Sequence, residues 1–170
     1  MVKKVYSFDE YDKYLCLKPP VELWLIVLYL LLPFVIKPLT FLFARRGGDI
    51  TILKDIQNIL YPNDLTLMLA FMASIPALIF AYAWTRRKPG ASENVKKICR
   101  NGAVMLSATA IMNMIVIFVP LLTGVLHRIH WSGWVQAGLL FVIIGYLHTS
   151  QRVKDTFSDF PKESSSVKLR

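Results

Sequence analysis

Four long apolar blocks constrain this chain more than any other feature of its sequence. They cover residues 21–44, 65–84, 102–126 and 131–150. A helix needs about 20 residues, at a rise of 1.5 Å each, to cross a hydrocarbon core about 30 Å thick. The first three blocks reach that length, and the fourth reaches it when the interfacial residues Trp131, Trp134, His148 and Thr149 are counted.

A soluble four-helix bundle is the main alternative to a membrane protein. The chain is 55% hydrophobic, with a mean hydropathy of +0.46. Helices of a soluble bundle keep one polar face, and the second and third blocks have none. The sequence therefore predicts an all-α membrane protein with four transmembrane helices. Its parts are an N-terminal tail (1–20), a transmembrane domain (21–150) and a basic C-terminal tail (151–170).

The distribution of basic residues predicts the orientation of the chain in the membrane. Fifteen of the 20 lysines and arginines lie in the first tail, in the link at 85–101 and in the last tail. The positive-inside rule places such segments in the cytoplasm. An even number of spans agrees with cytoplasmic location of both termini. We expect the basic link to contact anionic headgroups of the bilayer, which explains the net charge of +9 without a nucleic-acid partner.

Lys37 interrupts the first apolar block and is followed directly by Pro38. Sixteen residues after Val21, it lies about 24 Å along a straight helix. Its side chain could extend to the outer interface, with Pro38 loosening the helix where it emerges. The alternative is a buried lysine that pairs across helices or lines a polar cavity.

The first outer loop contains an amphipathic pattern. In DITILKDIQNIL the apolar residues recur at helical spacing, and Asp49 is suited to cap the first turn. The pattern predicts a short amphipathic helix that either lies in the outer interface or packs as a lid over the bundle.

Small residues predict where the helices approach one another. Such residues allow close packing in lipid, where dispersion replaces the hydrophobic drive. The predicted packing positions are Ala73, Ala77, Ala81, Ser107, Gly138 and Gly145. Pro76 is expected to kink the second span. Asn113, at the centre of the third block, is expected to bridge helices by hydrogen bonding, or alternatively to line a transport path.

The histidines are the strongest candidates for cofactor or metal chemistry. His127 and His130 are three residues apart at the outer face and could share a metal or proton site. His148 lies at the other end of the bundle, so it cannot supply the second axial ligand of one haem. Loop histidines are more often simply solvated. We therefore expect no catalytic residues, no metal, no cofactor and no enzymatic activity.

Two stretches resemble a known family. The first is YDKYLCLKPPVELWL, and the second is ILYPNDLTLMLAFMASIPALIFAYAWTRR. They are similar to the YfeZ-like group of uncharacterised bacterial inner-membrane proteins, small multi-pass proteins with a domain of unknown function. The resemblance implies the bacterial inner (cytoplasmic) membrane and supplies no activity.

These patterns favour a non-enzymatic accessory or structural subunit that packs against partner helices or lipid. Its partner would be another membrane protein or a second copy of the chain. A protomer of a small transporter or channel, with Lys37 and Asn113 near its pathway, is the alternative. A redox or metal protein that uses His127 and His130 is the third hypothesis.

Overall fold

The structure, a computed structural model, describes residues 6–12, 14, 16–124 and 131–161. Helices make up nearly all regular structure in this part of the chain, and its β features are limited to an isolated bridge between Tyr11 and Leu17. The elements are η1 (Phe8–Glu10), α1 (Val21–Leu30), α2 (Leu32–Arg45), α3 (Thr51–Leu60), α4 (Asp64–Ala73), α5 (Ile75–Thr85), α6 (Glu93–Arg100), α7 (Gly102–Leu122), α8 (Trp131–Thr149) and α9 (Gln151–Ser158).

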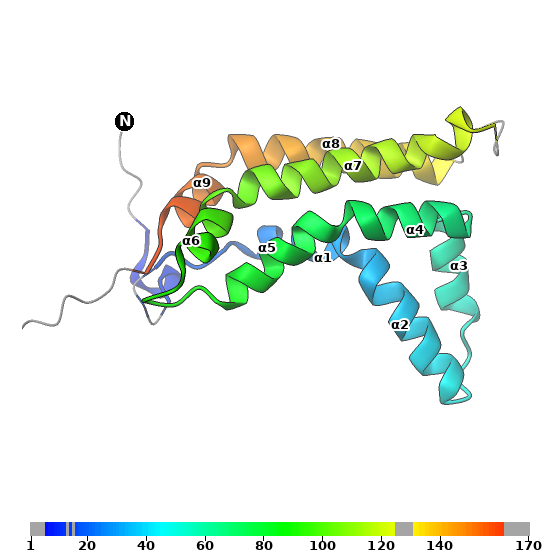
Figure 1. Cartoon of the computed structure of the whole chain (residues 1–170), viewed down its shortest axis with the longest axis horizontal. Helices are drawn as coiled ribbons and strands as arrows, with labels where there is room; N and C mark the ends of the chain where they lie inside the picture. Colours follow the sequence, from blue (N-terminus) through cyan, green and yellow to red (C-terminus); the bar gives the residue numbers. More distant parts are fainter. Residues whose placement is uncertain (1–5, 13, 15, 125–130, 162–170) are drawn as a thin grey trace, which may run out of the picture.

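Helix α7 is the central element of an elongated bundle (Figure 1). It packs along α8 on one side and along α4 and α5 on the other, and it also contacts α1, α6 and α9. The short elements gather at the two ends of the bundle. We call the end with η1, α6 and α9 the basic end, and the end with α3, the start of α4 and the last turn of α7 the pocket end.

Two of the predicted spans are broken in the structure. α1 and α2 meet at an angle of 66°, and α4 and α5 meet at 42°. Pro33 and Pro76 each lie in the first turn of the second helix of the pair. A proline there is tolerated, but its ring clashes with the carbonyl four residues earlier and so ends the preceding helix.

The break in the first block corrects the expectation for Pro38. This proline lies inside α2 and the helix continues past it, whereas the bend falls at Leu31, between α1 and α2. α1 buries Leu23, Ile26, Val27 and Leu30 in the bundle. α2 buries only Pro33 and Ile36, because the bend carries its remaining length away from the bundle (Figure 1).

The described residues include two helices, α7 and α8, that are each long and apolar enough to cross a membrane, and up to four spans if each bent pair is one. The all-helical, membrane-type architecture predicted from the sequence is therefore present. The predicted amphipathic helix is also present as α3, where the amide of Thr51 donates a 2.8 Å hydrogen bond to Asp49 Oδ1.

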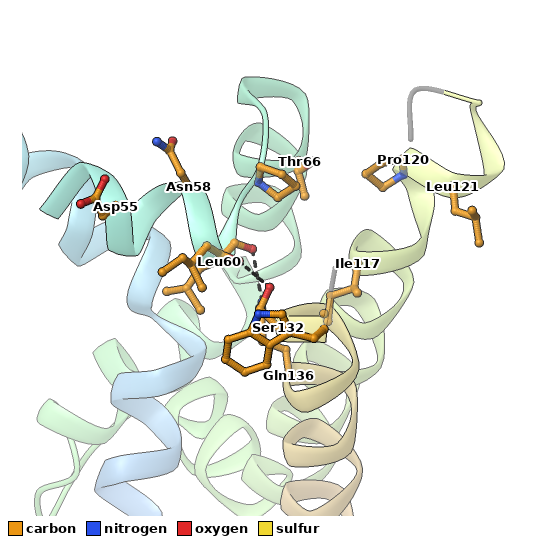
Figure 2. A pocket seen from close by; sticks show the side chains of 13 residues that line it. Asp55, Asn58, Leu60, Thr66, Ile117, Pro120, Leu121, Ser132 and Gln136 are labelled. Carbon is orange, nitrogen blue, oxygen red and sulfur yellow. Dashed lines mark hydrogen bonds between the residues drawn. The ribbon is translucent and has the colours of Figure 1, made fainter. Parts of the chain in front are cut away.

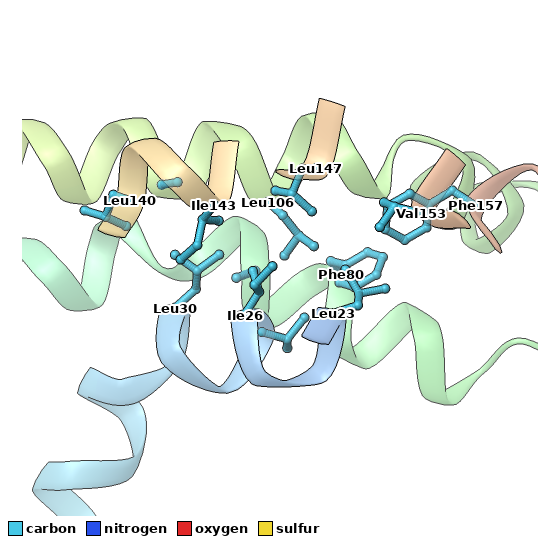
Figure 3. Close-up of a cluster of buried hydrophobic side chains, with 13 residues drawn as sticks. Leu23, Ile26, Leu30, Phe80, Leu106, Leu140, Ile143, Leu147, Val153 and Phe157 are labelled. Atoms are coloured by element: carbon cyan, nitrogen blue, oxygen red, sulfur yellow. The ribbon is translucent and has the colours of Figure 1, made fainter. Parts of the chain in front are cut away.

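The largest hydrophobic cluster fills the space between α1, α5, α7, α8 and α9 (Figure 3). Leu30 and Leu140 lie at one edge of the cluster and Leu106 near its middle, and Phe80 lies against Phe157 with the ring centroids 5.6 Å apart. All five side chains are at most 5% exposed. This cluster closes the interior of the bundle between the pocket end and the basic end.

Direct contacts between the two tails cap the basic end. The Tyr6 hydroxyl donates a 2.6 Å hydrogen bond to Asp155, and Arg152 forms an ion pair with Glu10. The amide of Leu17 donates to Asp159 Oδ2 at 2.7 Å. The first and last described segments of the chain therefore lie at the same end of the bundle.

Candidate functional site

A pocket of about 810 Å³ opens at the pocket end, between α3 and the facing ends of α7 and α8 (Figure 2). Its walls are mainly apolar. The apolar lining includes Ile59, Leu60, Pro62, Ile117, Leu121 and Trp131. The polar lining consists of Asp55, Asn58, Thr66, Ser132 and Gln136. A concave, mostly apolar surface with a few polar groups is the usual form of a small-molecule site, and its volume lies within the common range of roughly 300–1,000 Å³.

Two hydrogen bonds from α8 fix the wall that α3 contributes. Ser132 Oγ donates to the carbonyl of Ile59 at 3.0 Å, and Gln136 Nε2 reaches the carbonyl of Leu60 at 3.5 Å. Carbonyls in the last turn of a helix have no partner within that helix. The two side chains therefore satisfy the end of α3 and hold it against α8.

The start of α4 forms the adjacent part of the wall. Asn63 caps this helix, and its side-chain oxygen accepts a 2.7 Å hydrogen bond from the amide of Thr66. Thr66 itself is buried. Tyr61, in the link between α3 and α4, has a pKa above its ordinary value because it is buried.

A second, smaller cavity of about 20 Å³ lies deeper in the bundle. It shares Leu60, Thr66, Ile117 and Gln136 with the outer pocket. Its lining adds Tyr29, Tyr61 and Asn113. A cavity of this size with several polar neighbours holds about one water molecule. Beyond it, the leucines of the large cluster close the path toward the basic end.

Asn113 is therefore brought to a polar cavity, and its side-chain hydrogen bond among the described residues is made within its own helix. Its side-chain amide donates to the carbonyl of Thr109 on its own helix, at 3.0 Å. The contact between α7 and α8 that does involve polar side chains lies nearer the basic end. There, Ser107 Oγ is 3.1 Å from His148 Nε2.

Lys37 lies outside both cavities. Its ammonium is 4.0 Å from Asp64 Oδ1, and the side chains of the two residues are 48% and 89% exposed. Asp64 is the first residue of α4, so the contact joins the side of α2 to the pocket end. Pairs this exposed contribute little to stability. The geometry fits a lysine at the edge of the bundle better than one enclosed within it.

The predicted packing positions divide into two groups. Ala73, Ala77 and Ser107 are buried and Ala81 is half-buried against the large cluster. Gly138 and Gly145 are exposed, and a Cβ added at either would find nothing within 4 Å. Within the described part of the chain, the space beside these two glycines is therefore open, and their role in helix packing stays a prediction.

The remaining candidates concern metal chemistry. His127 and His130 lie outside the described residues. Within the described part of the chain, no group of three or more His, Cys, Asp or Glu side chains could hold a metal ion.

A buried cation organises the basic end. Arg87 is 8% exposed, and its guanidinium lies 4.5 Å from the ring centroid of Trp84. It donates to the carbonyls of Thr156 and Asp159. Both described cysteines, Cys16 and Cys99, are buried free thiols near this arginine. Burial raises the pKa of the Cys16 thiol to about 11, although Arg87 acts in the opposite direction.

Several pocket residues escaped the sequence analysis. Ser132 and Gln136 are the clearest case, since they are four residues apart and so lie on one face of a helix in the fourth apolar block. That spacing of polar residues in an apolar block could have identified them. Thr66 and Tyr29 carry no comparable signal, because single hydroxyl residues are common in helices of every kind.

Comparison with known proteins identifies a family but no activity. No curated protein and no solved structure matches the chain. The family model described as a protein of unknown function, DUF2919, matches residues 6–159. The match includes η1, all the described helices and the two cavities. The resemblance to a family without an assigned activity is thus confirmed at this level, and the chain belongs to the DUF2919 family.

Proposed function

We propose that the chain is a four-span protein of the bacterial inner membrane, with both termini and the link at 86–101 in the cytoplasm. The contact between the first and last described segments supports an even number of spans, because it places both at one end of the bundle. The α4–α5 pair runs along α7 and brings the chain from the pocket end to the basic end, where α6 lies (Figure 1). If α7 crosses the bilayer, the bent pair beside it must cross as well.

The charge of the basic end supports this orientation. α6 and the residues before it present exposed basic side chains at Arg86, Lys88, Lys97 and Arg100. Juxtamembrane cations of this kind bind anionic headgroups of the cytoplasmic leaflet. Replacing Ala91 by cysteine, in a variant without Cys16 and Cys99, tests the proposed orientation. A membrane-impermeant thiol reagent should label it in inverted vesicles and leave it unlabelled in intact cells.

The role that the geometry supports best is that of a non-enzymatic accessory subunit, which packs against a partner helix, a second copy or lipid. The main observation in favour of this role is the exposed arm formed by α2 and α3. This arm leaves the bundle at the 66° bend. Phe41, Leu42 and Phe43 near its tip are 66%, 51% and 47% exposed. Apolar surface of this extent needs a lipid or protein neighbour.

The test is purification from the native host in mild detergent, with identification of what co-purifies. Replacing Phe41 and Phe43 by alanine should release a protein bound at the arm. Replacing Phe141, which is 73% exposed on α8, by alanine should not. A chain that is monomeric, without a protein partner or retained lipid, and that turns over a substrate would contradict the proposal.

A protomer of a small transporter is the second candidate, and the two adjoining cavities favour it. They lead from the pocket end to Asn113 near the middle of α7, while the large hydrophobic cluster closes the bundle toward the basic end. This is the arrangement expected of a state open to the outside. A cysteine at position 113 should react with an impermeant reagent added outside. If a reagent added on the cytoplasmic side does not label this cysteine under any condition, that result would count against transport.

A further inference from the structure

The pocket at the pocket end combines three properties that together specify a type of ligand. It lies beside apolar side chains that face away from the bundle, it has apolar walls, and it carries polar groups at one side. An amphiphile has the same division between chain and headgroup. The argument rests on the proposed membrane embedding and adds a ligand to it.

Acyl chains would have direct access to the pocket. Ile59, Leu121 and Trp131 line it and are also 48%, 41% and 67% exposed at its border. In a bilayer these side chains contact lipid, so a chain could enter sideways without passing through water. Because lipid tails are as apolar as these walls, the binding of a chain here depends on close packing rather than on exclusion from water.

The headgroup side is formed by α3. Asp55 and Asn58 are exposed on this helix and line the pocket on the α3 side (Figure 2). Amphipathic helices of this type lie at the level of the headgroups. The pocket therefore spans the boundary between the headgroup and chain regions of the outer leaflet.

The charge of the lining selects among headgroups. Among the described residues that line the pocket, Asp55 is the only acidic or basic side chain. A carboxylate attracts an ammonium group and repels an additional anion. Asn58 and Gln136 provide further hydrogen-bonding groups for phosphate or ester oxygens.

We infer that the pocket between α3, α7 and α8 binds an amine-bearing zwitterionic membrane lipid, with its acyl chain against Leu121 and Trp131 and its ammonium group near Asp55. The site would retain this lipid from the outer leaflet while the remaining bilayer exchanges around the bundle.

Photo-crosslinking of the full-length protein tests this inference. The protein is reconstituted in vesicles of equal phosphatidylethanolamine and phosphatidylglycerol, with a trace of either lipid carrying a diazirine in its acyl chain. Phosphatidylethanolamine cross-links should concentrate on residues 117–121 and 131–136, saturate, and compete with unlabelled lipid. Uniform, unsaturable labelling of all lipid-facing helices would overturn the inference. Absence of cross-links from α7 and α8 would instead overturn the proposed membrane embedding.

Matched variants sharpen the result. Leu121→Trp fills the pocket and should reduce cross-links there several-fold, whereas Leu122→Trp, on the next residue and 79% exposed, should not. Asp55→Asn should reduce the preference for the ethanolamine lipid, and Asp49→Asn, outside the pocket, should leave it unchanged. Equal effects of Leu121→Trp and Leu122→Trp would refute the assigned site. Equal effects of Asp55→Asn and Asp49→Asn, or a preference for phosphatidylglycerol, would refute the assigned headgroup. If Leu121→Trp does not fold, the saturation of cross-linking in the wild-type protein tests the site by itself.

Discussion

The strongest test of the packing at the basic end is a single added methyl group at Gly102. A Cβ at this position would lie 2.5 Å from Phe80 Cε2 and 2.9 Å from Phe157 Cε1. Neither ring can move freely, because Trp84 packs against both, with centroid separations of 5.5 and 5.9 Å. Overpacking of a close-packed core costs about 1–3 kcal/mol.

Gly102→Ala should therefore lower the melting temperature by roughly 2–12 °C, taking about 2–4 °C per kcal/mol for a chain of this size. Gly138→Ala is the matched control, since its added methyl group meets nothing within 4 Å. Replacing a glycine inside a helix by alanine gains up to about 1 kcal/mol, so this variant should be equal to or more stable than the wild type. Thermal unfolding of the purified protein in one detergent, followed by tryptophan fluorescence, measures both.

A double-mutant cycle separates overpacking from other effects. Phe80→Leu removes the nearest ring atoms, so it should cost less in the Gly102→Ala background than in the wild type. Coupling energies between contacting residues are about 0.5–3 kcal/mol. Additive effects, or a Gly102→Ala variant as stable as Gly138→Ala, would refute this account of the packing.

Three further predictions concern single groups. Burial raises the pKa values of the Cys16 and Cys99 thiols, and that of Cys16 reaches about 11. Both thiols should therefore resist a maleimide at pH 7.5 until the protein is denatured. Rapid labelling of the folded protein would contradict their burial. Hydrogen bonds from Thr51 lower the pKa of Asp49 below its usual 3.8. The Asp49 carboxylate therefore stabilises the first turn of α3 above pH 3.8, and this stabilisation is lost as the pH falls through the lower pKa of Asp49 in the folded protein. The protection of this turn against amide exchange, relative to the intrinsic exchange rate at each pH, should fall on acidification in the wild type and much less in Asp49→Asn, whose side chain does not titrate. Ser74 is fully buried and its hydroxyl has no hydrogen-bond partner among the described residues, so Ser74→Ala should be neutral or stabilising by up to about 1 kcal/mol in the same thermal unfolding assay.

The sequence predicts the helices much better than their bends. Hydrophobic length locates α7 and α8, and the pattern around residues 49–60 locates α3. Pro33 and Pro38 look equivalent in the sequence, since each removes one hydrogen bond from an apolar helix. The bend falls before Pro33, at the point where α1 ends its buried face and α2 leaves the bundle. That distinction depends on tertiary packing.

The candidate site was predictable only in part. Asn113 stands out as an amide in an apolar block, and the structure places it at the inner cavity. Arg87 looks like one of several orientation charges, but it is buried because carbonyls of α9 and its C-terminal end accept its hydrogen bonds. Those carbonyls are about 70 residues away in the chain, and no local pattern indicates such an arrangement.

The contact between the two tails has a consequence for biosynthesis. Tyr6 and its acceptor Asp155 are separated by 149 positions, so during synthesis the segment with Tyr6 is made before the segment that supplies its acceptor. At a synthesis rate of about 5–20 residues per second, that interval is roughly 7–30 s. During it, the Tyr6 hydroxyl and the Leu17 amide lack the acceptors that Asp155 and Asp159 later supply. Completion of this contact thus requires that translation has passed Asp155, and a chain that ends before α9 would leave the Tyr6 hydroxyl without its acceptor.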